Sequence, residues 1–291
     1  MSERILTIVI PVHNNYQLTA NCLAHVFRST YPREQMQIII IDNNSKDNTK
    51  NLIKYLIEKE NLPIIYIPFT EEHAIRMGIT PGSPFSVDLD KIIGPYGEGQ
   101  GYLKGTNIGW QLVQTPFVML LNNDVFMSPT CVEILINAAK SSKEIGIVGG
   151  SEYLPDGRPS KTKPFIFFNR ENLSAANLLK DYKDLNIPEN SEIVDVEDMG
   201  FACVVIKKEV WEKIGYFDEQ FAPCMYEQED YCLRAKLAGF RNVIATKAEF
   251  VHNVGSTTAS NWQFYQSVLK DNRQKFYNKW QGIFQTGSVT F

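Results

Sequence analysis

Short apolar runs rich in isoleucine and valine alternate along this chain with segments that have the periodicity of an amphipathic helix. The runs predict buried strands at residues 5–12, 37–45, 63–67, 117–121 and 145–150. Between them, apolar residues at helical spacing predict helices with the faces Leu18–Cys22–Val26 and Leu52–Ile53–Leu56–Ile57, and further helices in 104–113 and 131–140. Strands that are apolar on both faces are typical of a parallel sheet covered by helices on both sides. The alternation therefore predicts a single α/β domain with a mostly parallel central sheet flanked by helices.

The composition agrees with such a domain and excludes several other classes of protein. The chain has 291 residues, of which 44% are hydrophobic and 21% charged, and its net charge is −4. This charge does not indicate a nucleic-acid-binding protein. No apolar run approaches the ~18 residues of a membrane-spanning helix, and the first residues lack a signal-peptide pattern. We therefore expect a cytoplasmic protein, whose five cysteines are reduced and mostly buried.

Three polar clusters follow predicted strands at the points where the strands end. They are His13–Asn14–Asn15, Asp42–Asn43–Asn44 and Asn122–Asn123–Asp124. One such cluster is an ordinary turn, but ligands of open parallel sheets bind outside the carboxyl ends of the strands, where all three would meet. Asp124 is also flanked by apolar residues, where a carboxylate is unfavourable unless it holds a metal ion or hydrogen-bond donors.

The segments around these clusters resemble a known family. "TIVIPVHNN", "IIIIDNNSKDNT", "GYLKGTNIGW" and "FVMLLNNDVFMSP" are similar to the four nucleotide-sugar-binding segments of family 2 glycosyltransferases with the GT-A fold, a Rossmann-like architecture. Residues 201–221, 226–257 and 273–280 follow the family's order, so the resemblance covers nearly the whole chain except 69–100 and 151–197. Within the family, the chain looks most like the rhamnosyltransferase-like branch, in which the metal motif often reads Asn-x-Asp. We expect residues 1–150 to form the nucleotide-sugar-binding half and residues 151–291 the acceptor-binding half and C-terminal helix.

The resemblance assigns roles to individual residues. It places at the nucleotide sugar the residues Pro11, His13, Asn15, Asp42, Asn44, Asn107, Asn122 and Asn123. Asp42 would accept hydrogen bonds from the base or ribose, and Asn122 would contact the ribose or a metal-bound water. Asp124 would bind a divalent ion, which His252 could also reach. Oxygen ligands with at most one imidazole suit Mn²⁺ or Mg²⁺ better than zinc.

The catalytic base is the point at which the chain departs from the family. In the family, an acidic motif precedes a "CLR"-like helix, and the first aspartate of the motif takes the acceptor's proton. This chain has Gln228 at that position, and glutamine cannot act as a base. Asp230 is our first candidate, followed by Glu229 and Glu227. Alternatively, the acidic run only favours the dipole at a helix N-terminus. Phe201 replaces a usual glycine and is expected to narrow the acceptor pocket.

The resemblance implies a metal-dependent, inverting hexosyl- or deoxyhexosyl-transferase of polysaccharide biosynthesis. It would use a UDP-, dTDP- or GDP-linked sugar and a hydroxyl of a glycan, lipid-linked or other acceptor. The alternatives are a binding protein without turnover, consistent with Gln228, and a nucleotidyltransferase, disfavoured because no Gly-rich basic loop follows the first strand. The irregular segment 69–101 is expected to border the donor site. Residues 261–280 predict a helix packed on the core, although its basic residues leave peripheral contact with the inner face of a membrane open.

Overall fold

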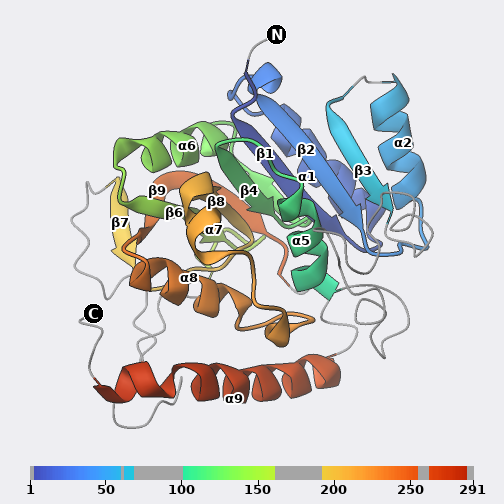
Figure 1. The fold of residues 1–291 in the computed structure, drawn as a ribbon. Helices are drawn as coiled ribbons and strands as arrows, with labels where there is room; N and C mark the ends of the chain where they lie inside the picture. The colour runs from blue at the N-terminus through green and yellow to red at the C-terminus, as the bar shows by residue number, and fades with distance from the viewer. Residues whose placement is uncertain (1–2, 60–61, 69–100, 161–191, 255–261, 287–291) are drawn as a thin grey trace.

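The computed structural model describes residues 3–59, 62–68, 101–160, 192–254 and 262–286 (Figure 1). In chain order the elements are β1 (Leu6–Val12), α1 (Tyr16–Phe27), η1 (Arg33–Gln35), β2 (Met36–Asp42), α2 (Thr49–Lys59), β3 (Ile64–Pro68), α5 (Gly101–Gln111), β4 (Phe117–Leu121), β5 (Val125–Met127), α6 (Cys131–Ser141), β6 (Ile145–Tyr153), β7 (Ile193–Val196), β8 (Cys203–Lys207), α7 (Lys208–Ile214), η3 (Glu219–Phe221), α8 (Glu227–Leu237), β9 (Arg241–His252) and α9 (Trp262–Thr286). The predicted strands and helices of the first 150 residues are confirmed to within a few residues. The segment 69–101, apart from Gly101, lies outside the described residues.

The strands of the described residues form one sheet in the order β3-β2-β1-β4-β8-β6-β9-β5, and β7 pairs with β9. The strands β3, β2, β1 and β4 are parallel, as are β6 and β9. The strand β8 lies antiparallel between β4 and β6, and β5 and β7 are antiparallel to β9. The predicted α/β fold with a mostly parallel sheet is therefore confirmed, with an antiparallel strand inserted at its centre.

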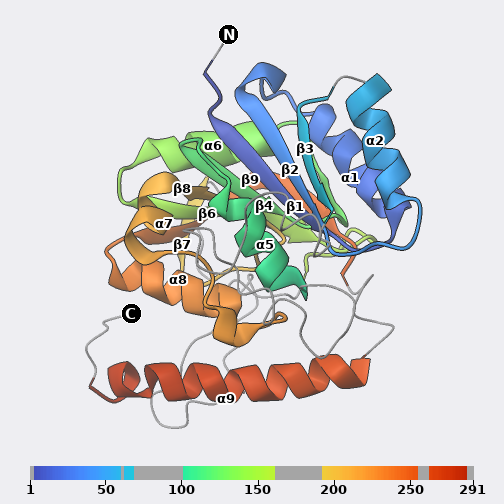
Figure 2. The same cartoon turned by 45° about the vertical axis from the view of Figure 1, so that its right-hand side comes forward.

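The alternation of side chains along the strands divides the core into two layers. On one face, Ile8 of β1 and Ile40 of β2 pack with residues of α1, α2 and α6. On the other face, Val9 and Ile39 pack with residues of α5, α7, α8 and α9. Figure 2 shows these helices on the two sides of the sheet. Strands such as β1, β2 and β4 are therefore buried on both faces.

The directions of the strands determine which residues meet at one edge of the sheet. The strands β1, β2, β4, β6 and β9 all end at this edge, because β8 reverses direction between β4 and β6. The antiparallel β8 and β5 begin there. The residues that follow β4, the end of β6 and the end of β9 are therefore brought together, although about thirty residues separate the first two in the chain and about a hundred separate the ends of β6 and β9.

The helix α9 lies beside α8, on the side away from the sheet (Figures 1 and 2). Phe276 and Trp280 are buried in the core on this side, and the Asn272 side-chain amide donates to the carbonyl oxygens of Phe221 and Cys224 at 2.6 and 2.8 Å. The prediction that the aromatic C-terminal segment packs on the core is confirmed. Within the described part of the chain, no helix has the length and apolarity to cross a membrane.

Candidate functional site

The first two polar clusters are joined by hydrogen bonds at the sheet edge. Asn14 has a left-handed backbone, with φ of 55°, which asparagine tolerates better than most residues. Its side-chain oxygen accepts from the Lys46 N–H at 2.7 Å, and its own N–H donates to the Ser45 hydroxyl at 2.8 Å. His13 Nδ1 lies 2.7 Å from the Asn43 carbonyl oxygen. The turns after β1 and β2 are therefore held together by direct hydrogen bonds.

Asp42 ends β2 with its side chain buried and hydrogen-bonded. Its Oδ1 accepts from the Ser45 N–H at 2.8 Å, and its Oδ2 accepts from the Tyr66 hydroxyl at 2.5 Å. Burial and this hydrogen bond raise the pKa of Tyr66. Tyr66 of β3 thus helps to orient the Asp42 carboxylate. The sequence analysis did not predict this role for Tyr66.

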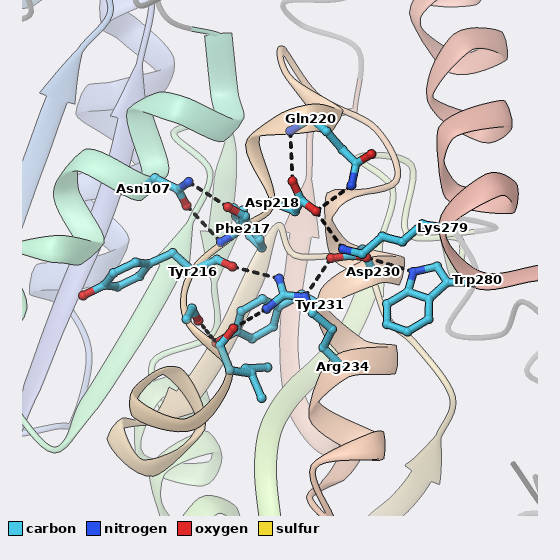
Figure 3. Close-up of polar contacts among 12 residues, drawn as sticks. Asn107, Tyr216, Phe217, Asp218, Gln220, Asp230, Tyr231, Arg234, Lys279 and Trp280 are labelled. Carbon is cyan, nitrogen blue, oxygen red and sulfur yellow. Dashed lines mark hydrogen bonds and ion pairs between the residues drawn. The ribbon is translucent and has the colours of Figure 1, made fainter. Parts of the chain in front are cut away.

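The other residues assigned to the nucleotide differ in how far their side chains are engaged within the protein. Pro11 is buried within β1. Asn15 precedes α1 in a left-handed conformation, and the Asn44 side-chain oxygen accepts from Lys46 Nζ at 3.0 Å. Asn107 is buried on α5, where its amide makes two hydrogen bonds with the backbone of Phe217, at 3.0 and 3.1 Å (Figure 3). Asn107 therefore joins α5 to the segment before η3.

The third cluster meets β9 and β6 at the same edge. Asp124 Oδ1 lies 3.2 Å from Nε2 of His252, and the other ring nitrogen, Nδ1, lies 2.7 Å from Oε1 of Glu152. The Asn123 amide donates to the Thr19 hydroxyl at 3.0 Å, whereas the buried Oδ1 of Asn122 has no hydrogen-bond partner among the described residues. The structure thus brings together the two predicted metal ligands and adds Glu152, which the sequence analysis missed.

His252 lies between two carboxylates. Burial disfavours the charged imidazolium, but hydrogen bonds and negative charges from Asp124 and Glu152 outweigh burial and raise the pKa of His252 to about 9. The protonated ring then holds the two carboxylates together. A metal ion bound at Nε2 would take the place of that proton.

The residues at this point fit a divalent ion that receives further ligands from a bound molecule. Among the described residues, no three histidine, cysteine or acidic side chains are grouped so that they could hold a metal ion by themselves. Asp124 and His252 offer one oxygen and one nitrogen ligand, and Asn122 offers a buried amide oxygen that no other described residue binds. Mg²⁺ and Mn²⁺ accept such small sets when substrate oxygens and water complete the coordination.

Asp230, the first candidate for the base, is held inside the protein between α8 and α9 (Figure 3). It is fully buried. Its Oδ2 accepts from Arg234 Nε at 2.8 Å, and its Oδ1 accepts from Trp280 Nε1 at 2.9 Å and contacts Lys279 Nζ at 2.6 Å. Lys279 also binds Asp218, at 2.7 Å. Oδ1 of Asp230 therefore links α8 to α9, while Oδ2 binds Arg234 on the same helix.

Across the described ranges of the chain, Glu227 and Glu229 are engaged by fewer hydrogen-bond donors than Asp230. The Oε2 atoms of both side chains are buried without a hydrogen-bond partner among the described residues. Burial raises the pKa of Glu227 to about 7. Burial and the charge of Glu227 also raise the pKa of Glu229. These carboxyl groups can exchange a proton near neutral pH.

Tyr102, on α5, lies in a negatively charged environment. Burial raises the pKa of this partly buried tyrosine, and the negative charges of Glu227 and, as a smaller contribution, Asp124 raise it further. The Tyr102 hydroxyl donates to the Phe201 carbonyl oxygen at 3.1 Å, while the Phe201 ring is buried against Phe217. Phe201 therefore contributes its backbone here, and its ring packs in the core instead of lining a pocket.

Family models and curated proteins show what this chain is similar to. Residues 7–77 match the family model described as glycosyl transferase family 2, and residues 85–274 match the model described as glycosyltransferase like family 2. A dolichyl N-acetyl-alpha-D-glucosaminyl phosphate 3-beta-D-2,3-diacetamido-2,3-dideoxy-beta-D-glucuronosyltransferase of Methanococcus voltae is 25% identical over 183 residues, which are 60% of this chain and 56% of that protein. The chain thus spans little more than half the length of this relative.

Two solved structures share the fold. The mannosyltransferase PcManGT from Pyrobaculum calidifontis, in complex with GDP-Man and Mn²⁺, superposes with a TM-score of 0.61 at 13% identity, over 90% of this chain and 60% of that one. TarS of S. aureus, in complex with UDP-GlcNAc, superposes with a TM-score of 0.55 at 12% identity, over 85% and 58% of the two chains. At these identities the likeness establishes the GT-A fold alone.

Proposed function

Because the chain belongs to glycosyltransferase family 2, we propose that it transfers a hexosyl or deoxyhexosyl group from a nucleoside-diphosphate sugar to a hydroxyl group, with a divalent ion and with inversion at the anomeric carbon. The observation that carries the proposal is the meeting of Asp124, His252 and the Asn122 oxygen, which has no hydrogen-bond partner among the described residues, at one edge of the sheet. This edge is where open parallel sheets bind ligands.

The turns after β1 and β2 would hold the nucleotide. Asp42 would accept a hydrogen bond from the base or ribose while Ser45 and Tyr66 keep its carboxylate oriented. Asp124 and His252 would hold Mn²⁺ or Mg²⁺, which offsets the negative charge of a departing diphosphate. The separation into a donor half, 1–150, and an acceptor half, 151–291, remains our proposal, with His252 joining the donor side from the second half.

Transfer requires a base for the acceptor. As the acceptor oxygen bonds to the anomeric carbon, the bond from that carbon to the diphosphate breaks and the hydroxyl proton passes to a carboxylate. We propose Glu227 for this step, with Glu229 as the second candidate. A carboxyl pKa raised towards neutrality suits proton transfer at cellular pH. Asp230 is a poor base, since three donors already engage its oxygens.

The relatives guide the choice of substrates. The complexes with GDP-Man and UDP-GlcNAc favour GDP- and UDP-linked donors, and the resemblance to the rhamnosyltransferase-like branch adds dTDP-linked deoxyhexoses. The name of the Methanococcus voltae relative favours a dolichyl-phosphate-linked acceptor. A cytoplasmic protein in peripheral contact with a membrane would meet such an acceptor.

A screen for thermal stabilisation tests the donor half of the proposal. The protein is heated with UDP-, dTDP- and GDP-sugars, each with and without Mn²⁺. A true donor present at 100 times its Kd stabilises by about 2.7 kcal/mol, and we expect this only with the metal. Donors that stabilise are then tested for transfer and for slow hydrolysis. If no nucleotide sugar stabilises the protein under either condition, the proposal fails.

A binding protein without turnover is the second candidate function. Gln228 stands at the family's usual base position and favours this alternative. It predicts metal-dependent donor binding with neither transfer nor hydrolysis, and unchanged behaviour when Glu227 and Glu229 are both replaced by glutamine. Any donor turnover that depends on one of these glutamates excludes it.

A further inference from the structure

We propose that Glu152 is a positioning residue, which holds the ring of His252 so that Nε2 faces Asp124. The inference rests on the metal site proposed above and adds a residue that neither the family motifs nor the sequence pattern identified. Its basis is the continuous line of contacts from Glu152 Oε1 to His252 Nδ1, at 2.7 Å, and from His252 Nε2 to Asp124 Oδ1, at 3.2 Å.

The contact from Glu152 determines which nitrogen of His252 can act as a ligand. A neutral imidazole carries its proton on one nitrogen and binds a metal ion through the other. A carboxylate beside Nδ1 keeps the proton there, which leaves Nε2 as the ligand atom and fixes the plane of the ring. Without Glu152, the proton could occupy Nε2 and the ring could turn away from Asp124.

An irregularity between β6 and β9 directs Glu152 into this position. Gly150 pairs with Ala245, but the next residue of β6, Ser151, pairs with Glu249, so β9 contains three additional residues at this point. The Ser151 hydroxyl stabilises the irregularity by donating to the Thr246 carbonyl oxygen at 2.8 Å. Bulges of this kind turn side chains toward active sites.

A glycine is needed where the two strands approach each other most closely. A Cβ atom at Gly150 would lie 2.2 Å from the Ala248 carbonyl oxygen, far inside the contact limit. The irregularity places Glu152 opposite Phe250, two residues before His252 on the same face of β9. A glutamate side chain can reach such a diagonal neighbour, so the backbone and the side-chain contact agree.

The experiment measures Mn²⁺ binding, so it does not depend on knowing the substrates. Free Mn²⁺ is followed by electron paramagnetic resonance during titration of the whole protein, alone and with UDP or GDP. We expect Glu152→Leu to weaken Mn²⁺ binding about 10–100-fold. Glu152→Gln, which keeps an oxygen acceptor for Nδ1–H, should retain more affinity than Glu152→Leu. The control is Glu249→Gln, which removes an exposed carboxylate of β9 and should change nothing.

A double-mutant cycle shows whether Glu152 acts through His252. In the His252→Ala background, Glu152→Leu should produce no further loss; an additive loss would overturn the inference. If Asp124→Asn weakens Mn²⁺ binding and Glu152→Leu does not, the inference about Glu152 fails while the metal site stands. If Asp124→Asn has no effect either, the proposed metal site itself is wrong. Urea denaturation of each variant excludes unfolding as the cause of a loss.

Discussion

Replacing Asp230 by alanine should destabilise the whole protein, because this carboxylate joins α8 to α9. The side chain is completely buried and receives hydrogen bonds or ion contacts from Arg234, Lys279 and Trp280, at 2.6 to 2.9 Å (Figure 3). Removing one partner of a buried ion pair leaves uncompensated charge, which typically costs about 3–5 kcal/mol.

The surroundings place the expected loss at the lower end of that range. Arg234 keeps two carbonyl acceptors, those of Ile214 and Tyr216, and Lys279 keeps Asp218. We therefore expect about 3 kcal/mol for Asp230→Ala. Asp230→Asn retains an oxygen acceptor but not the charge, so we expect roughly 1–2 kcal/mol.

Urea denaturation followed by tryptophan fluorescence measures the change, and transfer is assayed well below the unfolding transition. Trp280→Phe is the comparison variant, since it removes the indole N–H together with part of a buried ring and should cost at least about 1 kcal/mol. In combination with Asp230→Ala it should add less than its separate effect, because the acceptor is already gone. An unchanged urea midpoint for Asp230→Asn, together with a 100-fold loss of transfer, would refute this argument and restore Asp230 as the base.

Further predictions concern the proposed reaction and the burial of Glu227. Asp124→Asn should abolish transfer and the Mn²⁺ dependence of nucleotide binding without unfolding the protein; calorimetry with equal affinities with and without metal would contradict this. Asp42→Ala should weaken nucleoside diphosphate binding by about 1–3 kcal/mol, and Tyr66→Phe, which only frees the carboxylate, by less; equal binding by both variants and the unmodified protein would assign Asp42 to turn structure. If Glu227 is the base, kcat/KM should rise with pH through about 7, since its raised pKa keeps it protonated below that value, and Glu227→Gln should remove this rise. Because the folded-state pKa of Glu227 lies above the unfolded value of about 4.3, the contribution of Glu227 to the unfolding free energy should be lost as pH rises toward 7. A pH series of urea midpoints that is identical for Glu227→Gln and the unmodified protein would argue against the burial of Glu227.

The alternation of strands and helices could be predicted because it depends on short-range patterns. Asp47 is an instructive case, since aspartate shortly before a helix is a typical capping residue. Its carboxylate does accept from the Thr49 N–H at 3.0 Å, and it also accepts from the Tyr16 N–H at 2.9 Å, at the start of α1. The second contact joins two helices whose proximity no local pattern reveals.

The order of the strands beyond β4 could not be predicted in the same way. The segment that forms β8 is as apolar as the parallel strands, and nothing in its residues indicates that it runs antiparallel between β4 and β6. Partner choice in a sheet depends on contacts between distant segments, which a single sequence does not display.

The site was predictable where a residue's place in the chain determines its place in the sheet. Asp124 follows a buried strand, and its position at the sheet edge was expected. Glu152 lies at the end of another parallel strand, and the same argument could have found it. Asp230 shows the limit: its partners Lys279 and Trp280 lie some fifty residues later on α9, so its neighbours in sequence suggested a base while its neighbours in space hold it as an anchor.

The central position of β8 affects the order in which the chain can fold during synthesis. Leu121, the last residue of β4, pairs with Cys203, so one edge of β4 has no partner until the ribosome has made roughly eighty further residues. At 5–20 residues per second this delay is on the order of ten seconds. During that time the apolar edge is open to pairing with other chains. Expression of this protein should therefore benefit from lower growth temperatures and from chaperones that shield nascent strands.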